Sequence, residues 1–508
     1  LTGCGSDDED SSPSGMAGSG GSGGAGGVGG EAGSAGSGGT AGSAGEGGSG
    51  GSTQTMNAMV RVVHASPTAP AVDLYAKGST TPLQANLAYG SATDYLELPE
   101  GTYDLEIRAA GADPADPPAF EVSGLSVMGG EKYTAIAAGD LGSTDAADQF
   151  RVIPLMEGFA NPDEGTIRAR IVHASFDAPT VDLDVGNDDP ANPELSGLDR
   201  FADTGEEGVA LPADASLQVG IAAGGSTVTA FTTPALTDRS ELFIIATGEL
   251  SDMPSDASGF ALLAVLPDSS TAWIKQNPFV YALHASPDAP AVDIYAGDAE
   301  LFDNVPFGAL GRIQVPGGSY TLDFFGGMAG PTPRPSTAPA ASASTPELMA
   351  GETYIAIATG LLAGSGDQAF QLFPIAEGFV APSDGEAVAR VVHASPDAPP
   401  VDIGTVSSPG MLDANPPIVN VPFPAATDQE GLVLPAETPL TLGVAATGSM
   451  ATAAEFDVNF ADGQKVVAVA AGLLSPSAGE QPFQLLVIDA TSTSILDPWG
   501  VASLSPNQ

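Results

Sequence analysis

A ten-residue motif that begins with histidine and ends with aspartate occurs four times in this 508-residue chain. The copies are His64-Ala-Ser-Pro-Thr-Ala-Pro-Ala-Val-Asp73, His173-Ala-Ser-Phe-Asp-Ala-Pro-Thr-Val-Asp182, His284-Ala-Ser-Pro-Asp-Ala-Pro-Ala-Val-Asp293 and His393-Ala-Ser-Pro-Asp-Ala-Pro-Pro-Val-Asp402. Their histidines are 109, 111 and 109 residues apart and are the only histidines in the protein. Spacing of this regularity is typical of tandem units, so we expect a series of similar domains.

The sequence also contains a longer repeat, each copy of which includes two copies of the motif. The segments 154–175 and 374–395 are identical at 12 of 22 positions, although they lie 220 residues apart. This agreement predicts a duplicated two-domain unit, A-B-A-B. The expected domains are 56–160 (A), 161–277 (B), 278–382 (A) and 383–499 (B), followed by a C-terminal tail over 500–508.

Within each copy, apolar residues recur with a period of two, which indicates β-strands. Tyr103, Leu105 and Ile107 alternate with polar residues, for example, and the other copies contain matching segments. Continuous apolar runs such as 354–358 predict strands that are covered on both faces. Proline and glycine separate the runs. We therefore predict an all-β protein of four tandem β-sandwiches of immunoglobulin-like size, each with about seven or eight short strands.

The repeated motif resembles a known family. In the first copy it is followed by the turn Leu98-Pro99-Glu100-Gly101-Thr102-Tyr103, and the two together are similar to the bacterial domain of unknown function 4397. The likeness extends from Met59 to about Asp497, although copies two and four lack the full turn and copy two has Phe176 in place of proline. The resemblance implies a secreted or surface-attached bacterial repeat protein, and it supplies neither an activity nor catalytic residues.

The N-terminal region predicts a membrane anchor and a spacer. The only cysteine, Cys4, follows Leu1-Thr2-Gly3, a run that resembles the lipobox of bacterial lipoproteins, in which the cysteine is lipidated. The alternative is an arbitrary start with a spare thiol. We expect residues 1–13 to be a lipobox remnant with an acidic patch. Residues 14–55 are expected to be a disordered linker, because 20 of the 39 residues from Ser14 to Ser52 are glycine.

The charge of the chain excludes one class of partner. Acidic residues number 63 against 14 basic ones, for a formal net charge of −49. Neutralising a phosphate backbone requires clustered Lys and Arg, so nucleic acid is excluded as a partner. Docking of basic residues on anionic lipid is disfavoured for the same reason. Attachment to a membrane would therefore depend on acyl chains at Cys4.

Each motif contains His, Ser and Asp, the residue types of a hydrolytic triad, but a Ser-Pro turn offers no strained nucleophile elbow. A metal site needs three or four converging ligands, and each copy has one histidine and no second histidine or cysteine nearby. Calcium suits the acidic surface better, although no segment follows the spacing of a calcium loop. We expect no catalytic residue, no metal site and no cofactor. We expect the motif residues to be structural: the histidine ring hydrogen-bonds across the turn, and the last aspartate orients the ring or caps a strand end. The residues concerned are His64, Asp73, His173, Asp182, His284, Asp293, His393 and Asp402.

These inferences give one expected function and one alternative. We expect a non-enzymatic, lipid-anchored protein of the bacterial cell envelope, at the outer membrane or cell surface. Its tandem β-domains would serve adhesion, matrix contact or binding of an envelope or extracellular protein or glycan. The alternative is a surface module that binds calcium or a glycan.

Overall fold

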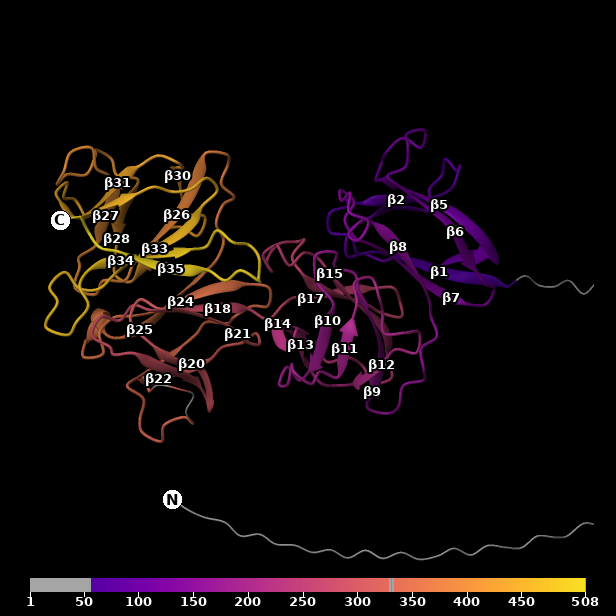
Figure 1. Cartoon of the computed structure of the whole chain (residues 1–508), viewed down its shortest axis with the longest axis horizontal. Helices are drawn as coiled ribbons and strands as arrows, with labels where there is room; N and C mark the ends of the chain where they lie inside the picture. Colours follow the sequence, from indigo (N-terminus) through magenta and orange to yellow (C-terminus); the bar gives the residue numbers. More distant parts are fainter. Residues whose placement is uncertain (1–55, 329, 331–332, 508) are drawn as a thin grey trace, which may run out of the picture. The chain divides into compact units, whose positions relative to one another are not determined.

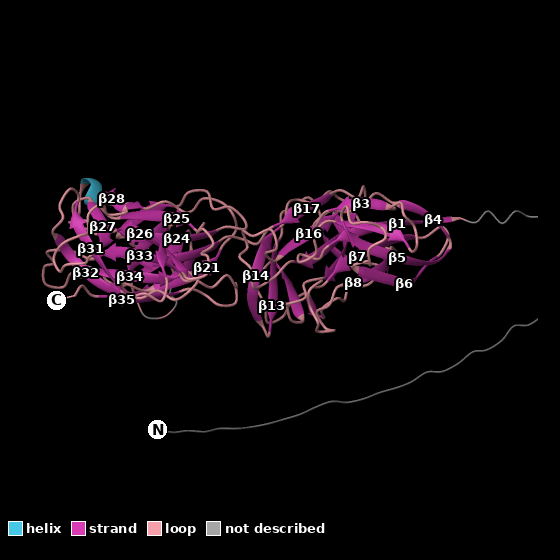
Figure 2. Cartoon of the chain, turned by 90° about the horizontal axis from the view of Figure 1, so that it is seen from above, coloured by secondary structure: helices cyan, strands magenta, loops and turns pink. Residues whose placement is uncertain are grey.

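The computed structural model describes residues 56–328, 330 and 333–507, and these residues form strands joined by turns and loops. Eight small sheets assemble into four two-sheet units that follow one another along the chain (Figure 1). The one helical segment among the described residues is the single turn η1 (Gly366–Gln368), cyan in Figure 2. The all-β prediction is therefore confirmed. Cys4 and the Gly/Ser-rich stretch lie outside the described residues.

We call the four units sandwiches 1 to 4. Sandwich 1 contains β1 (Asn57–His64), β2 (Val72–Ala76), β3 (Gln84–Leu87), β4 (Leu96–Pro99), β5 (Gly101–Ala109), β6 (Phe120–Val127), β7 (Lys132–Ala138) and β8 (Arg151–Met156). Sandwich 2 contains β9 (Thr166–His173), β10 (Val181–Val185), β11 (Leu195–Leu198), β12 (Val209–Pro212), β13 (Gln218–Ala223), β14 (Ser226–Thr232), β15 (Glu241–Thr247), β16 (Ala261–Val265) and β17 (Thr271–Ile274). Sandwich 3 contains β18 (Phe279–His284), β19 (Val292–Ala296), β20 (Ala299–Val305), β21 (Leu310–Gln314), β22 (Thr321–Gly326), β23 (Ala341–Ser344), β24 (Thr353–Thr359) and β25 (Gln371–Ala376). Sandwich 4 contains β26 (Glu386–His393), β27 (Val401–Thr405), β28 (Ile418–Val421), β29 (Ala425–Ala426), β30 (Leu432–Pro435), β31 (Leu440–Ala446), β32 (Thr452–Val458), β33 (Lys465–Ala471), β34 (Gln484–Asp489) and β35 (Gly500–Leu504).

The four sandwiches share the order of their central strands, and sandwiches 2 and 4 have additional strands in one sheet. One sheet, which we call the histidine sheet, contains the strand that ends in the motif histidine. This strand lies between an antiparallel neighbour and a parallel one, as in β4-β1-β7-β8. The second sheet begins just after the motif, as in β3-β2-β5-β6. In the parallel pair each histidine has an alanine as its partner: His64↔Ala137, His173↔Ala246, His284↔Ala358 and His393↔Ala470.

The parallel partner strands are buried on both faces, as their apolar runs predict. In β24 every residue is buried, and its side chains alternate between two cores. Ala356 and Ala358 face the second sheet of sandwich 3, whereas Ile355 and Ile357 belong to a cluster shared with sandwich 4. A neighbouring sandwich therefore covers the second face of each parallel partner strand.

Sandwiches 1 and 2 pack histidine sheet against histidine sheet, and so do sandwiches 3 and 4. The first shared cluster joins Val63 and Ile136 of sandwich 1 to Phe243 and Ile245 of sandwich 2, all fully buried. A threonine side chain also spans each interface. Thr247 Oγ1 donates to the carbonyl of Ala65 at 2.6 Å, and Thr359 Oγ1 donates to the carbonyl of Ala394 at 2.9 Å. Each pair therefore has a continuous apolar interior, and a buried hydrogen bond joins its two sandwiches.

Three buried arginines add hydrogen bonds across these interfaces. Arg61 Nη1 donates to the carbonyl of Leu266 at 2.7 Å. In the reverse direction, Arg170 Nη1 donates to the carbonyl of Met156 at 2.6 Å. Arg390 of sandwich 4 makes the matching bond to the carbonyl of Ala376 at 2.6 Å. Such charge-assisted bonds fix the register of the two sheets.

Each pair also contains one tryptophan at its interface. Trp499 stacks on Tyr281 of sandwich 3, with ring centroids 4.5 Å apart and planes inclined by 12°. Trp273 of sandwich 2 packs against Tyr89 of sandwich 1 at 5.2 Å. Trp499 is buried and Trp273 is 37% exposed, so separation of a pair would expose Trp499 and remove the aromatic contact of Trp273.

The predicted C-terminal tail is wrong in part. Residues 500–504 form β35, which pairs antiparallel with β34, and Val501 packs against the cluster shared by sandwiches 3 and 4. The reason is that the edge of β34 offers unpaired backbone groups, which a five-residue segment can satisfy. The expected boundaries at 160, 277 and 382 fall in the connections before β9, β18 and β26. Within the described ranges, no helix has the length and hydrophobicity to cross a bilayer.

Candidate functional site

The motif histidines are buried, and each ring closes the turn that follows it. Their exposed fractions are at most 3%. In each sandwich Nε2 lies within hydrogen-bonding distance of the carbonyl oxygen of the second motif proline, six residues later. The four bonds are His64 to Pro70 at 3.0 Å, His173 to Pro179 at 2.9 Å, His284 to Pro290 at 3.0 Å and His393 to Pro399 at 3.1 Å.

These contacts determine the tautomer of the rings. A carbonyl oxygen can only accept, so Nε2 must carry the proton. In three copies Nδ1 accepts from the backbone N–H of the motif serine at 3.3 Å, which requires Nδ1 to be unprotonated. His173 is the exception, because its buried Nδ1 has no hydrogen-bond partner. Burial lowers the pKa of all four rings below the ordinary value of 6.5. The rings are therefore neutral at pH 7.

The motif serines are buried and bonded within the fold. In three copies the hydroxyl donates to the carbonyl of a glycine that follows the parallel strand: Ser66 to Gly139 at 2.6 Å, Ser286 to Gly360 at 2.7 Å and Ser395 to Gly472 at 2.7 Å. In sandwich 2, Ser175 Oγ instead donates to Asp177 at 2.9 Å. No motif serine in the described chain has its hydroxyl bonded to a histidine, as a nucleophile would require.

The fifth motif residue holds the loop after the parallel strand. Asp288 accepts from the amides of Leu362 and Ala363 at 2.9 and 3.2 Å. Asp177 and Asp397 make the same pair of bonds in sandwiches 2 and 4, and Thr68 accepts a single bond from Leu141 in sandwich 1. The bound amides lie 73 to 78 residues away along the chain, and not in the turn beside the motif.

The last motif aspartate bonds backbone amides of the second sheet and does not contact the ring. Asp73 accepts from the amides of Asn86 at 2.7 Å and Gly111 at 2.9 Å. Asp182, Asp293 and Asp402 make corresponding bonds, to Gly197, to Asn304 and Met328, and to Asn420 and Gly448. Of the two expected roles, the geometry matches the strand-end cap. Among the described residues no hydrogen bond joins a motif aspartate to a motif histidine, so no triad is assembled.

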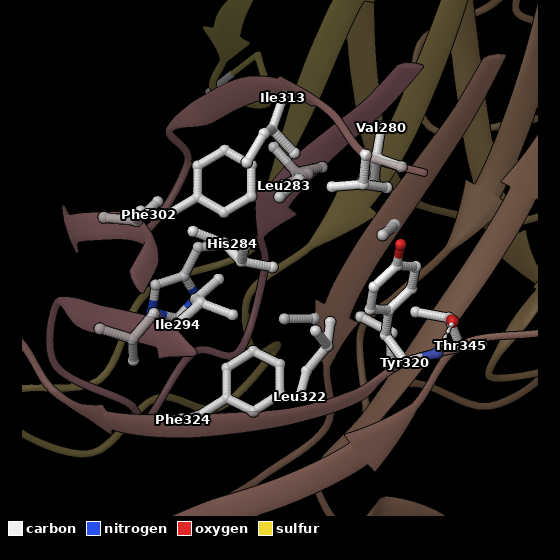
Figure 3. Close-up of a pocket in the computed structure, with 18 of the residues that line it drawn as sticks. Val280, Leu283, His284, Ile294, Phe302, Ile313, Tyr320, Leu322, Phe324 and Thr345 are labelled. Atoms are coloured by element: carbon white, nitrogen blue, oxygen red, sulfur yellow. Dashed lines mark hydrogen bonds between the residues drawn. The ribbon is translucent and has the colours of Figure 1, made fainter. Parts of the chain in front are cut away.

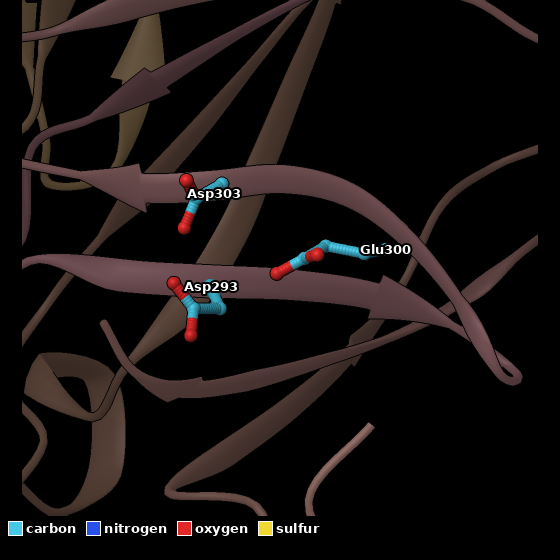
Figure 4. Close-up of side chains that lie close together, drawn as sticks. All are labelled: Asp293, Glu300 and Asp303. Carbon is cyan, nitrogen blue, oxygen red and sulfur yellow. The ribbon is translucent and has the colours of Figure 1, made fainter. Parts of the chain in front are cut away.

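One group of three carboxylates has the spacing of a cation site. Oxygens of Asp293, Glu300 and Asp303 lie within 4.8 Å of one another in sandwich 3 (Figure 4). Each carboxylate is already engaged. Amides bond Asp293, Gly330 N–H donates to Asp303 at 3.1 Å, and the Tyr295 hydroxyl donates to Glu300 at 2.9 Å. The protein itself therefore supplies hydrogen-bond donors to the whole cluster.

A second acidic group lies between sandwiches 1 and 2. Burial, together with the charges of Asp252, Asp177 and Asp140, raises the pKa of Glu249 to about 7. Asp140 belongs to sandwich 1 and the other residues to sandwich 2. Ionisation of Glu249 is therefore opposed by carboxylates on both sides of the interface. The sequence shows these acids but not their proximity.

The interiors of the sandwiches are lined by apolar side chains. In sandwich 3 a small cavity of about 40 Å³ lies between the two sheets, with His284 at one end (Figure 3). The rings of Phe302, Tyr320 and Phe324 point into this space. Sandwich 4 contains a larger cavity of about 280 Å³.

Comparison with known proteins gives one match. The family model described as domain of unknown function (DUF4397) matches residues 58–184 and 278–404. Each match covers a whole sandwich and continues through the first two strands of the next, to just beyond the second motif of the pair. No curated protein matches the chain.

Proposed function

The chain belongs to the family described as domain of unknown function (DUF4397), and from this premise we propose that it is a non-enzymatic, lipid-anchored protein of the bacterial cell envelope. Its four sandwiches are copies of one domain. They are presented at the outer membrane or cell surface to an extracellular or envelope protein or glycan.

The assignment of all four sandwiches to one domain rests on recurrent geometry. Sandwiches 2 and 4 contain the strand order of sandwiches 1 and 3, with a further edge strand, β17 or β35. Their histidines make the same bond to a proline carbonyl six residues later. A bond of this kind recurs because each copy needs it to close the same turn.

The non-enzymatic assignment is carried by one observation: the polar groups of the motif are used inside the fold. The ring Nε2, the serine hydroxyl and the last aspartate each bond a group of the same sandwich in all four copies. A catalytic histidine must exchange a proton with a substrate or nucleophile, and a buried neutral ring tied to a carbonyl does not.

The membrane attachment rests on Cys4 and on charge. A chain with a net charge of −49 is repelled by anionic lipid, so acyl chains on a cysteine supply the attachment. The same charge keeps the presented domains solvated and separate from the membrane.

The anchor is tested by metabolic labelling. The chain is expressed with a bacterial export signal fused to its N-terminus, in cells that are fed an alkyne fatty acid. A Cys4→Ser variant serves as the control. We expect label on the parent chain and none on the variant, together with digestion of the exposed domains by protease added to whole cells. A soluble and unlabelled parent chain would contradict the anchor.

The rival function, a module for calcium or a glycan, is tested separately. A glycan array and thermal unfolding with calcium or chelator are applied to the full chain. A reproducible glycan ligand, or a calcium-dependent rise in melting temperature, would favour the rival.

A further inference from the structure

Sandwich 4 differs from its neighbours in the space between its two sheets. Its cavity measures about 280 Å³, whereas the cavities of sandwiches 2 and 3 measure about 40 Å³ each. Sandwiches 3 and 4 have the same arrangement of central strands, so their side chains can be compared at matching positions.

The first size difference is at a register-matched pair of the histidine sheet. In sandwich 3 the parallel strands place Val280 opposite Tyr354. In sandwich 4 the same positions hold Ala389 and Val466. Ala389 is smaller than Val280, and Val466 is smaller than the aromatic Tyr354. The smaller pair leaves unfilled volume between the sheets at this position.

A second difference lies in the facing sheet. Phe302 of sandwich 3 pairs with Ile294 and points into the small cavity (Figure 3). Its counterpart in sandwich 4 is Ile418, which pairs with Ile403. The cavity of sandwich 4 is thus bounded by smaller residues on both sheets.

The lining of this cavity indicates the chemistry of its occupant. The walls are apolar and come from both sheets, among them Val391, Ile403, Ile418, Leu442, Leu485 and Val487. Four lining residues are polar, and of these Thr405, Asp457 and Asn459 are exposed to solvent, whereas Gln464 is half-buried. The residues that line it include no Lys, Arg or His. An anionic head group would find no counter-charge there and would be repelled by Asp457.

The volume is large enough for a ligand. An apolar cavity of about 150 Å³ stays dry and binds benzene. The cavity of sandwich 4 has almost twice that volume, which fits a two-ring aromatic molecule or a medium-length alkyl chain.

We propose that sandwich 4 binds a small, uncharged, hydrophobic molecule between its sheets, with any polar end at the solvent-exposed rim formed by Thr405, Asp457 and Asn459. This site goes beyond the proposed envelope function and holds whether or not the chain is lipidated.

The test uses the full chain and the neutral fluorescent probe N-phenyl-1-naphthylamine. We expect saturable enhancement of fluorescence at one probe per chain, reversed by 1-decanol and not by decanoate. The double variant Ala389→Val/Val466→Tyr places the side chains of sandwich 3 in sandwich 4 and is expected to weaken binding at least about tenfold. Val419→Thr, at a position 61% exposed on β28, is the matched control and is expected to bind like the parent.

A reciprocal variant keeps the proposal testable if the filled variant does not fold. Val280→Ala/Phe302→Ile/Tyr354→Val in sandwich 3 copies the smaller residues of sandwich 4, and we expect the stoichiometry to rise from one probe to two. Unchanged binding by a folded Ala389→Val/Val466→Tyr variant would overturn the proposal. A stoichiometry that stays at one in the folded reciprocal variant, or equal competition by decanoate, would overturn it as well.

Discussion

Replacing Ile357 with alanine tests the paired packing of sandwiches 3 and 4. Ile357 is fully buried on the face of β24 that meets sandwich 4, within the shared cluster. The change removes three carbon atoms, which lowers the free energy of unfolding by about 2.4 kcal/mol at about 0.8 kcal/mol each. The cavity left behind raises the loss to about 3 to 4 kcal/mol. For a pair of this size the melting temperature should fall by about 6 to 16 °C.

The two tryptophans allow the pairs to be followed separately. In a Trp273→Phe background the only remaining tryptophan is Trp499, which stacks on Tyr281 between sandwiches 3 and 4. In a Trp499→Phe background Trp273 reports on sandwiches 1 and 2. Thermal unfolding by tryptophan fluorescence should show the full Ile357→Ala loss in the first background and a smaller change in the second, because sandwiches 2 and 3 are also in contact, for example through the bond from the Ala230 amide to Gln314 Oε1 at 2.8 Å.

The matched control is Val433→Ala, at a side chain 45% exposed on β30, for which we expect a change within about 0.5 kcal/mol. An unchanged Trp499 transition in the Ile357→Ala variant would refute the shared interior. An equal fall at both tryptophans would contradict a loss centred on sandwiches 3 and 4.

Three further predictions concern charge. Burial lowers the pKa of the folded histidines below 6.5, so their contribution to stability is complete above pH 6.5 and is lost as the pH falls. His284→Ala should therefore lower the melting temperature of sandwiches 3 and 4 at pH 7.5. The same variant should show a weaker loss of stability on acidification than the parent chain. Burial and carboxylate repulsion raise the folded pKa of Glu249 to about 7, so the stability of sandwiches 1 and 2 should fall as the pH rises from about 4.5 to 7. Glu249→Gln should remove that fall and raise the Trp273 transition at pH 8, and an unchanged transition would contradict the assignment. Millimolar calcium should leave melting unchanged; a shift that Asp303→Asn abolishes would instead identify a calcium site.

Much of the fold could be predicted because period-two alternation survives in most strands. The continuous run Tyr354 to Ala358 indicated a strand covered on both faces, and β24 is one. The second cover could not be identified from sequence, because Ile355 and Ile357 show only that they are apolar. Which sheet they meet depends on contacts with sandwich 4.

The C-terminal strand was missed for a related reason. The segment 500–504 is short, and β35 exists because the β34 edge pairs with it. A run of five residues carries too weak a periodic signal to predict a strand without knowledge of that edge.

The motif was predicted in part. A bond from the ring across the turn followed from the Ser-Pro-x-Ala-Pro spacing, since these residues bring the chain back toward the histidine. The glycine carbonyls and loop amides bound by Ser286 and Asp288 lie about 74 residues away along the chain, where local spacing gives no signal. The cavity of sandwich 4 could not be predicted from the sequence either. The small side chains of Ala389 and Val466 indicate a cavity only once it is known that the two residues are paired in the sheet.

The central claim, that the motif histidines are neutral rings built into the fold, is tested most directly by nitrogen NMR of the imidazole rings. The chain has only four histidines, so each can be resolved and assigned with single His→Gln variants. We predict four rings protonated at Nε2 at pH 7.5, each titrating below pH 6.5 if it titrates before unfolding. A ring protonated at Nδ1, or one that titrates at or above pH 6.5 in the folded chain, would contradict the account.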